Sequence, residues 1–499
     1  MPAGSARPAR TAGACSPART ARRGRSTGCS SASPTAPASS PRSRRLSARS
    51  GSTSRTSSFP GLRRGRLGRP ARVRIEPATA LVGHIAVPGD KSISHRAVLV
   101  GAVAEGETLV RGFGRSADTE STIAAVRALG ATVHEEDVDT ICVEGSGLRG
   151  LREIDAPVDC GNSGTTLRLL AGLLAGQSGR FELTGDDSLR SRPVDRIATP
   201  LAEMGAHVET ADGRPPLVVQ GGSLQAIRYE LPVASAQVKS CVLHAGLYAE
   251  GTTTVVEPLP TRDHTEIMLA AAGAPLTRRP GRVSIGPAER LELPEVEVPG
   301  DFSSAAPFVV AATLLPGSEL TIHDVGLNPR RTGLLDVLAR MGARITAFNR
   351  RRSSSGESMG DLEVHSAELV ATRVRAEEVP LLIDELPLFA LAAASARGES
   401  RVEGAQELRV KETDRLEIVT TSLRALGVRI ENRHDGFGVR GVPSRPKGGG
   451  MDSGGDHRIA MLGAVAGLVS RDGVEIRSPQ AVAVSFPGFF ELLDSVTQR

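Results

Sequence analysis

A pattern of about 70 residues recurs along the chain after residue 72, and it limits the possible fold more than any other feature. In each copy an amphipathic stretch ends at a glycine that leads straight into a strand-like run. The copies of this junction are residues 129–133, 204–208, 272–276, 341–345 and 426–430. A glycine just after a helix adopts the left-handed conformation that ends it. The repeat therefore predicts an α/β fold in which helices run directly into strands.

A second recurring feature is an apolar helix that follows a polar loop. These helices are expected to begin near Lys91, Ser163, Ser235, Ser303, Asp384 and Asp456. A helix that is apolar on nearly all sides is usually buried. Its first N–H groups are unpaired and its dipole is positive at that end, so each polar loop favours an anion.

Each unit reads as strand, apolar helix, strand, amphipathic helix, strand, and six units fit the chain. Three units to a domain predict two globular halves. Similar Pro-Gly-Asp turns at 88–90 and 299–301 are the expected crossings. We expect a discontinuous domain from residues 73–89 plus 300–499 and a second domain from residues 90–299. The sixth unit lacks a final strand, and the strand-like run that begins at Arg72 is predicted to supply it.

The first 72 residues differ in composition from the rest. They hold sixteen arginines and no lysine, aspartate or glutamate, so the formal charge of +5 leaves residues 73–499 at −11. An acidic folded part argues against a nucleic-acid-binding protein led by a basic arm. Because the segment is rich in Ser, Pro, Ala and Gly without hydrophobic periodicity, we expect residues 1–72 to be a disordered leader.

Two interpretations of this leader remain open. An Arg- and Ser-rich, acid-poor segment suits a transit peptide, which would place the protein in a plastid. A wrongly assigned start in a GC-rich gene also accounts for it, and we favour this and expect a cytoplasmic protein. No apolar run reaches the roughly 18 residues of a membrane span. Five cysteines without a C-x-x-C pair argue against a structural zinc site.

Lysine is rare in this chain, with four lysines against fifty-seven arginines. Where arginine is the default, a lysine suggests a role for a compact ammonium group that can release a proton. We expect such a role for Lys91 and Lys411, which lie in polar segments. For Lys239 a functional role and a place along the side of a helix are both open.

Arginines and carboxylates gather where loops meet helices. The arginines are Arg96, Arg168, Arg190, Arg192, Arg262, Arg330, Arg331, Arg415 and Arg458. Together they suit the oxygens of phosphates and carboxylates. Asp301, Asp414 and Asp456 are expected to cap helices. Asp384 and Glu412 are candidate bases, because cationic neighbours would keep them ionised.

Six motifs resemble those of the 5-enolpyruvylshikimate-3-phosphate synthase family, in the family's order from about residue 73 to the C-terminus. They are GDKSISHR at 89–96, GNSGTTLR at 161–168, SRP at 191–193, SAQVKS at 235–240, RVKETDR at 409–415 and DHRIAM at 456–461. The resemblance implies a two-domain inside-out α/β barrel. It also implies transfer of the enolpyruvyl group of phosphoenolpyruvate to the 5-hydroxyl of shikimate 3-phosphate, with release of phosphate, on the pathway to chorismate and aromatic amino acids.

The resemblance also implies roles for single residues. Asp384 would take the hydroxyl proton, Glu412 would serve the methylene carbon, and Lys91 would lie on the leaving phosphate. Shikimate 3-phosphate is expected on Lys91, Ser92, Arg96, Ser235, Gln237, Thr261, Asp384 and Lys411. Phosphoenolpyruvate is expected on Lys91, Gly164, Thr165, Arg192, Gln237, Arg415 and Arg458. Neither a cofactor nor a metal is implied, and the chain is expected to act as a monomer.

Some positions depart from the family's pattern. Val484 stands where several relatives have a lysine, and Glu407 stands where many have an asparagine. Thr261 stands where a serine often contacts the shikimate phosphate, and its hydroxyl is expected to substitute. Gly164 matches the family's small residue at the phosphoenolpyruvate pocket, which predicts inhibition by glyphosate.

The nearest alternative is the other enolpyruvyl transferase, which has the same fold and acts on UDP-N-acetylglucosamine. It normally presents a catalytic cysteine on a mobile loop and an asparagine after the first lysine. Here the matching loop, residues 185–192, has no cysteine, and Ser92 follows Lys91. The sequence therefore favours shikimate 3-phosphate as the acceptor.

Overall fold

The computed structural model describes residues 71–499. Apart from its last two residues, the leader predicted for residues 1–72 lies outside this part of the chain. The described part is a mixed α/β fold, as the sequence predicted. None of its helices has the length and apolar character that a membrane crossing demands.

The six apolar helices predicted from the sequence all form, and each begins within two residues of its expected start. They are α1 (Lys91–Val103), α3 (Gly164–Leu174), α6 (Ala236–Gly246), α8 (Phe302–Leu314), α11 (Leu386–Ser395) and α13 (His457–Val469). Their bodies are almost wholly buried. All except α11 have a side-chain N-cap, supplied by Asp90, Ser163, Ser235, Asp301 and Asp456. The polar loops therefore fix where these helices begin.

The five predicted junctions between a helix and a strand also form. The helices are α2 (Ala117–Ala128), α5 (Asp195–Glu203), α7 (His264–Ala271), α9 (Gly333–Arg340) and α12 (Arg415–Ala425). The glycines that follow them all have positive φ: Gly130 at 108°, Gly205 at 99°, Gly273 at 85°, Gly342 at 94° and Gly427 at 88°. Asp414 caps α12, as expected. Short helical segments complete the set: α4 (Asp187–Arg190), α10 (Val379–Leu382), α14 (Phe489–Val496), η1 (Ile383–Glu385), η2 (Gln406–Val410) and η3 (Pro479–Val484).

Three four-stranded sheets lie between residues 107 and 297. In strand order they are β16 (Glu295–Glu297), β3 (Glu107–Arg111), β5 (Ile141–Glu144) and β4 (Thr132–Glu135); β6 (Val158–Asp159), β7 (Arg180–Thr184), β9 (Arg214–Gln220) and β8 (His207–Ala211); and β11 (Arg228–Glu230), β13 (Thr253–Val256), β15 (Arg282–Ile285) and β14 (Leu276–Arg279). In each sheet the first pair is parallel and the other two pairs are antiparallel. A short parallel pair joins β10 (Leu224–Gln225) to β12 (Ala249–Glu250).

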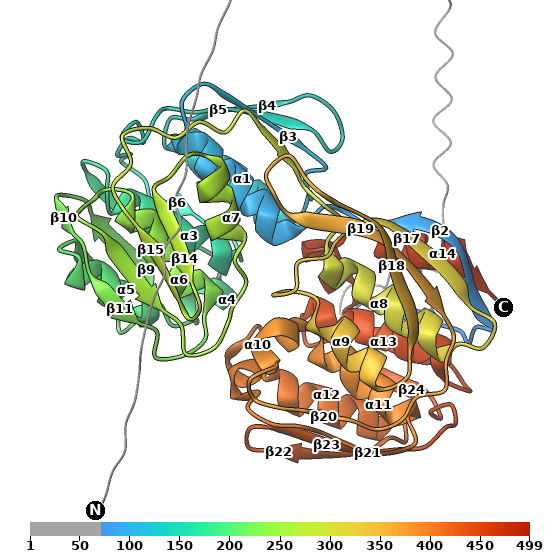
Figure 1. Ribbon diagram of the computed structural model, residues 1–499. Coiled ribbons are helices and arrows are strands. Elements are labelled where there is room, and N and C mark those ends of the chain that lie inside the picture. Colours follow the sequence, from blue (N-terminus) through green and yellow to red (C-terminus); the bar gives the residue numbers. More distant parts are fainter. Residues whose placement is uncertain (1–70) are drawn as a thin grey trace, which may run out of the picture. The chain divides into compact units, whose positions relative to one another are not determined.

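The remaining strands form three further sheets. In strand order they are β18 (Arg344–Arg352), β19 (Ser358–His365), β17 (Glu319–Gly326), β2 (Ala80–Ala86) and β26 (Thr497–Gln498); β20 (Arg373–Val374), β21 (Gly398–Val402), β23 (Gly436–Gly441) and β22 (Arg429–Arg433); and β1 (Arg72–Ile75), β25 (Val474–Arg477) and β24 (Gly449–Asp452). In Figure 1 the sheet of β21, β22 and β23 lies beside α11 and α12.

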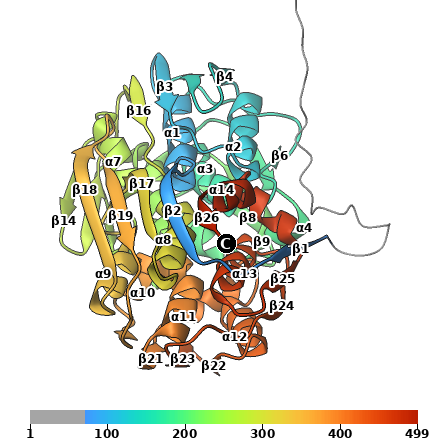
Figure 2. The same cartoon turned by 90° about the vertical axis from the view of Figure 1, so that its right-hand side faces the viewer.

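The two ends of the described chain meet this last set of sheets. β1 pairs antiparallel with β25, from Arg72 opposite Arg477 to Ile75 opposite Val474, so this strand does join the C-terminal part of the chain (Figure 2). The expectation that the chain ends without a strand after α14 was wrong, because the two residues of β26 pair with β2. Two residues are too few to leave a hydrophobic pattern in the sequence.

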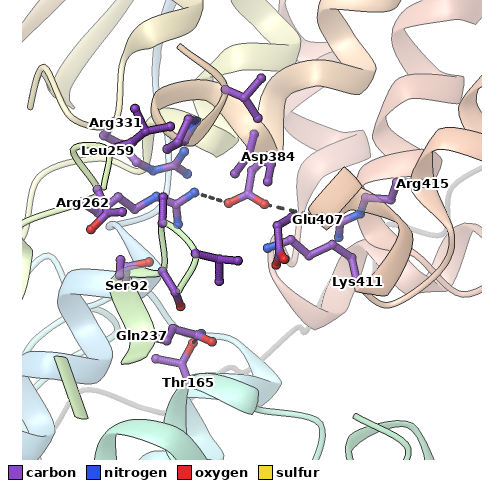
Figure 3. A pocket seen from close by; sticks show the side chains of 18 of the residues that line it. Ser92, Thr165, Gln237, Leu259, Arg262, Arg331, Asp384, Glu407, Lys411 and Arg415 are labelled. Carbon is purple, nitrogen blue, oxygen red and sulfur yellow. Dashed lines mark hydrogen bonds and ion pairs between the residues drawn. The ribbon is translucent and has the colours of Figure 1, made fainter. Parts of the chain in front are cut away.

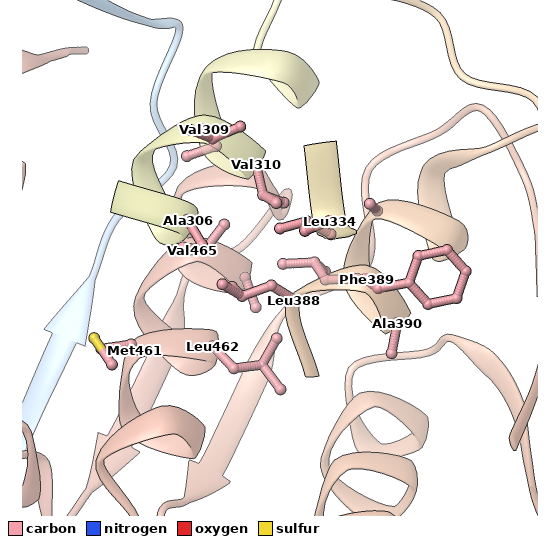
Figure 4. Packing of buried hydrophobic residues seen from close by; sticks show 14 of the residues in the cluster. Ala306, Val309, Val310, Leu334, Leu388, Phe389, Ala390, Met461, Leu462 and Val465 are labelled. Carbon is pink, nitrogen blue, oxygen red and sulfur yellow. The ribbon is translucent and has the colours of Figure 1, made fainter. Parts of the chain in front are cut away.

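Buried apolar side chains form two separate clusters. One draws on residues 78–87 and 302–496, and the other on residues 93–298. Figure 4 shows part of the first, where Val310, Leu334, Leu388 and Val465 from four different helices pack together. The side chains are aliphatic for the most part, so close packing of small residues takes the place of large aromatic rings.

The two Pro-Gly-Asp turns lie side by side. Gly89 and Gly300 form an antiparallel bridge, the Asp90 N–H donates to the Pro299 carbonyl at 2.8 Å, and the Asp301 N–H donates to the Pro88 carbonyl at 2.8 Å. A Cβ on Gly89 would lie 1.7 Å from the Gly112 carbonyl oxygen, so only glycine fits there. The chain therefore passes between its two hydrophobic clusters through one paired crossing.

Candidate active site

A cavity of about 470 Å³ lies where the first turns of α1 and α6 face the loops that lead into α11 and α12. A second, smaller cavity of about 170 Å³ shares Lys91, Gln237 and Lys411 with it, so the two adjoin. The larger one is lined by Lys91, Ser92, Arg96, Thr165, Ser235, Gln237, Thr261, Asp384, Lys411, Glu412, Arg415 and Arg458. The smaller one adds Gly164 and Arg192. Every residue that the sequence assigned to the site thus lines one of the two cavities.

Asp384 has cationic side chains around its carboxylate. Arg262 donates to it, and Arg415 Nη1 and Arg458 Nη2 lie 3.4 and 3.6 Å from its oxygens. Figure 3 shows Asp384 with Arg262 on one side and Lys411 and Arg415 on the other. Burial alone would raise the pKa of Asp384, but Arg458, Arg262 and Lys411 hold that pKa well below its ordinary value. The carboxylate is therefore ionised, as expected of a candidate base.

Glu412 is the second ionised carboxylate of the cavity. Arg415 Nη2 donates to it, and Arg192 Nη1 lies 3.9 Å away. Burial would raise the pKa of Glu412, but Arg415 above all, with His457 and Arg192, lowers it. Burial lowers the pKa of the neighbouring Lys411 even though Asp384 opposes this.

Lys91 lies in the first turn of α1 and points to Asp118 in the first turn of α2. The Lys91 Nζ is 2.8 Å from Asp118 Oδ2. Burial would raise the pKa of Asp118, but Lys91 together with His95 lowers it. The sequence did not reveal Asp118 as a site residue. An acidic residue in the first turn of an amphipathic helix is ordinary, and only the packing of α2 on α1 brings it to Lys91.

Arg96 is buried on α1 and its guanidinium is fixed by neighbours. Its Nε donates to Thr265 Oγ1 at 2.6 Å, its Nη1 to the Ser92 carbonyl at 2.8 Å and its Nη2 to Ser240 Oγ at 3.1 Å. Burial lowers the pKa of Arg96 to about 10, so it stays charged at neutral pH. A fixed cation at the cavity wall can bind an anion with little loss of side-chain entropy.

A polar chain of side chains joins the two cavities. Arg168 Nη1 donates to Gln237 Oε1 at 2.8 Å, and Gln237 Nε2 donates to Thr165 Oγ1 at 3.0 Å. Arg192 Nη2 donates to Asn162 Oδ1 at 2.6 Å, which holds its guanidinium at the smaller cavity. Burial lowers the pKa of Arg168 to about 10.

Some residues singled out in the sequence lie away from the cavities. Lys239 is buried, and its Nζ lies 2.7 Å from Glu257 and 2.6 Å from Glu266, which favours the structural one of its two possible roles. Arg190 pairs with Asp187 on the surface. Val484 lies in η3 and lines neither cavity.

Thr261 lines the larger cavity, but its hydroxyl donates to Glu257. A phosphate oxygen can only accept hydrogen bonds, so the hydroxyl would have to turn away from Glu257 to bind one. The Thr261 N–H also donates to Glu257, at 3.2 Å.

The arrangement is suited to ligands with several negative charges. Two ionised carboxylates stand among lysines and arginines, and the N-termini of α1 and α6 open onto the same space. Fixed cations and helix ends of this kind stabilise charge that develops on phosphate and carboxylate oxygens.

The model of one protein family, EPSP synthase (3-phosphoshikimate 1-carboxyvinyltransferase), matches residues 75–493. The chain belongs to the EPSP synthase family. This confirms the resemblance drawn from the six sequence motifs, and it makes the chain an enzyme of the 3-phosphoshikimate 1-carboxyvinyltransferase class.

Individual members of the EPSP synthase family are similar over most of their length. The 3-phosphoshikimate 1-carboxyvinyltransferase of Acidithiobacillus ferrooxidans is 50% identical over 418 residues, which are 84% of this chain and 96% of that protein. The one from Desulforudis audaxviator is 49% identical over 429 residues, 85% of this chain and 99% of that protein. The solved EPSP synthase of Acinetobacter baumannii has a TM-score of 0.77 at 40% identity and covers 85% of this chain and 98% of its own.

Proposed function

We propose that this chain carries out its family's reaction in the two adjoining cavities. The enolpyruvyl group of phosphoenolpyruvate is transferred to the 5-hydroxyl of shikimate 3-phosphate, and phosphate is released. The observation that carries the proposal is the position of Asp384. Its carboxylate meets Arg262 from residues 93–298, and Arg415 and Arg458 from residues 302–496, in a cavity that also holds Lys91 and Glu412.

Asp384 is the proposed base for the 5-hydroxyl proton. In the free protein its pKa is too low for strong basicity, because Arg458 and Arg262 stabilise the carboxylate. The phosphates and carboxylates of the substrates compete for the same guanidinium groups. Their binding withdraws positive charge from Asp384, so its pKa rises and the carboxylate becomes a better proton acceptor.

Glu412 is the proposed partner of the methylene carbon. Arg415 and Arg192, which lower its pKa, are also the proposed cations for phosphoenolpyruvate. When they turn to that substrate, the pKa of Glu412 rises, and the side chain can give a proton to the methylene carbon as the 5-oxygen adds to the neighbouring carbon. The same carboxylate takes a proton back from the resulting methyl group as phosphate leaves, which restores the methylene of the enolpyruvyl product.

Lys91 is the proposed cation at the leaving phosphate. Its ammonium group is held by Asp118 in this structure, and a phosphate oxygen of the substrate would compete with Asp118 for the same positive charge. It neutralises charge as phosphate departs and can supply a proton.

The wider assignments are those that the family resemblance implies. Shikimate 3-phosphate contacts Lys91, Ser92, Arg96, Ser235, Gln237, Thr261, Asp384 and Lys411. Phosphoenolpyruvate contacts Lys91, Gly164, Thr165, Arg192, Gln237, Arg415 and Arg458. Supporting this, all of these residues line one or both cavities.

We also propose the architecture in which this site is built. Residues 73–89 plus 300–499 form one domain and residues 90–299 the other, each an inside-out α/β barrel of three units. The two hydrophobic clusters and the shared order of parallel and antiparallel pairs in the sheets support this. We further propose that the enzyme acts as a monomer in the cytoplasm. Both walls of the proposed site come from one chain, so the site needs no second copy.

The experiment that tests this function follows both products. The full chain is incubated with phosphoenolpyruvate and shikimate 3-phosphate, and the phosphate is measured while the enolpyruvyl ether is detected by mass spectrometry. We expect the two products in equal amounts. Phosphate that appears without shikimate 3-phosphate, or without the ether, would mean hydrolysis instead of transfer.

A further inference from the structure

An ion pair at the edge of the two cavities has no part in the proposed chemistry. Arg196 in the first turn of α5 donates to Glu407 in η2 through two parallel hydrogen bonds, Nη1 to Oε2 at 2.8 Å and Nη2 to Oε1 at 3.1 Å. Glu407 lines both cavities, and Arg196 lines the smaller one. A two-bond pair of this kind fixes the orientation of both groups, which a single contact does not.

Each partner is anchored in a different hydrophobic cluster. Ile197, next to Arg196, is buried in the cluster of residues 93–298. Leu408, next to Glu407, is buried in the cluster that includes residues 302–496. The pair therefore joins the two sides of the site and does not brace one side alone.

The same two segments carry residues of the proposed site. Arg192 lies four residues before Arg196, in the short connection that leads into α5, while Lys411 and Glu412 follow Glu407 by four and five residues. Arg192 Nη1 is already within 3.9 Å of Glu412 Oε1. Any separation of Arg196 from Glu407 would thus draw Arg192 away from Lys411 and Glu412.

We infer that Arg196 and Glu407 form a positioning pair. The pair fixes the position of Arg192, a proposed phosphoenolpyruvate ligand on one side of the cavity, relative to Arg415 on the other side. The inference rests on the proposed function, because Arg192 and Arg415 are taken as phosphoenolpyruvate ligands on opposite sides. Neither member of the pair touches the reacting atoms. Their effect is to lower the Michaelis constant, KM, for phosphoenolpyruvate.

The direction in which the KM for phosphoenolpyruvate changes, when Glu407 is neutralised, distinguishes a positioning role from simple charge repulsion. Glu407 places a negative charge beside a cavity for two anionic substrates, and this charge alone repels them. If repulsion were its only effect, neutralising Glu407 would lower the KM for phosphoenolpyruvate. The positioning pair predicts the opposite, because loss of the pair releases Arg192 from its register.

The test uses Glu407→Gln in the full chain, with phosphate release followed against phosphoenolpyruvate at saturating shikimate 3-phosphate. We expect the KM for phosphoenolpyruvate to rise about threefold to tenfold, the range for a partly exposed two-bond ion pair, with kcat within about twofold of the unchanged protein. Glu399→Gln is the matched control. Glu399 is an exposed carboxylate that pairs with Arg401 on its own strand, and we expect no change in KM.

A charge exchange separates positioning from a general loss of structure. Arg196→Gln alone should raise the KM as Glu407→Gln does. The double variant Arg196→Glu with Glu407→Arg keeps the total charge and can re-form the pair, so its KM should fall below that of both single variants.

A KM that drops or stays constant in Glu407→Gln, or a double variant no better than the single ones, would overturn the inference. Failure of the proposed function would look different, because the unchanged protein itself would then release no phosphate with shikimate 3-phosphate.

Discussion

Asp384 is the single residue on which the proposed chemistry depends most. Asp384→Asn keeps the size of the side chain but removes the charge that accepts the proton. We expect kcat to fall by about 10²- to 10⁴-fold, the usual contribution of a general base, with a smaller change in KM. Phosphate release with shikimate 3-phosphate measures this. Asp324→Asn, at an exposed carboxylate outside both cavities, is the control, and a loss below tenfold in Asp384→Asn would remove Asp384 from the role of base.

Gly164 should decide how well the site accepts glyphosate. A Cβ at this position would lie 2.5 Å from Arg168 Nη1 and 3.6 Å from Arg192 Nη1. The Arg168 side chain can move, so Gly164→Ala should fold, but the methyl group and the displaced guanidinium take space at the smaller cavity. We expect the glyphosate inhibition constant to rise at least tenfold while the KM for phosphoenolpyruvate rises less. An inhibition constant that stays the same would show that glyphosate lies elsewhere.

His244 should make the protein less stable in mild acid. Burial lowers its pKa to about 4, and its Nε2 has no hydrogen-bond partner among the described residues. The unfolded chain binds a proton near pH 6.5 and the folded chain does not, so this group's stabilising effect is lost as pH falls from about 6.5 towards 4.

Replacing His244 tests this directly. Between pH 7 and pH 5 we expect the free energy of unfolding to fall by about 1–2 kcal/mol less in His244→Gln than in the unchanged protein, since glutamine does not titrate. Urea unfolding at several pH values gives the comparison. Parallel pH profiles for the two proteins would rule out His244 as the titrating group.

The sequence could predict those site residues that lie in one continuous polar loop. The first two turns of α1 carry Lys91, Ser92 and Arg96. Because these residues are close in the chain, the geometry of one helix is enough to place them on the same cavity. Asp118 and the turned Thr261 hydroxyl could not be predicted. Their roles depend on which helix packs beside α1 and on the buried Glu257 carboxylate.

At the scale of whole elements, the junctions between helix and strand are the most regular feature. Gly273 is the best place to test them, because its φ is +85° and no heavy atom lies within 4 Å of an added Cβ. Gly273→Ala therefore changes backbone conformation only. We expect a loss of about 1–2 kcal/mol of stability, measured by urea unfolding.

The control for this substitution is Gly222→Ala. Gly222 also has free space around an added methyl group, but its φ is not positive. Alanine there should leave stability unchanged or raise it slightly, since it restricts the unfolded chain. Equal effects of the two substitutions would show that left-handed backbone does not matter at the junction.

Helices were easier to predict than sheets for a physical reason. Each helix forms from residues that are neighbours in the chain, so caps, glycines and apolar runs reveal its ends. The three residues of β16 instead pair with β3, from which they are separated by more than 180 residues. No local sequence pattern predicts such a pairing, and the two residues of β26 are also too few to predict theirs.

For the whole molecule, the paired crossing at Gly89 and Gly300 shows why the site draws on distant parts of the sequence. The chain leaves one hydrophobic cluster after residue 87 and returns to it at residue 302, so Arg262 and Asp384 can face each other across one cavity. The repeat period predicted two halves. It could not predict which side chains would meet between them.

The central claim is that this cavity transfers the enolpyruvyl group to shikimate 3-phosphate. The most direct test measures phosphate release from phosphoenolpyruvate by the full chain, with shikimate 3-phosphate or UDP-N-acetylglucosamine as the acceptor. We predict release with shikimate 3-phosphate and none above background with the nucleotide sugar, and we predict that Asp384→Asn removes most of it. Release that depends on the nucleotide sugar, or release that needs no acceptor, would contradict the account.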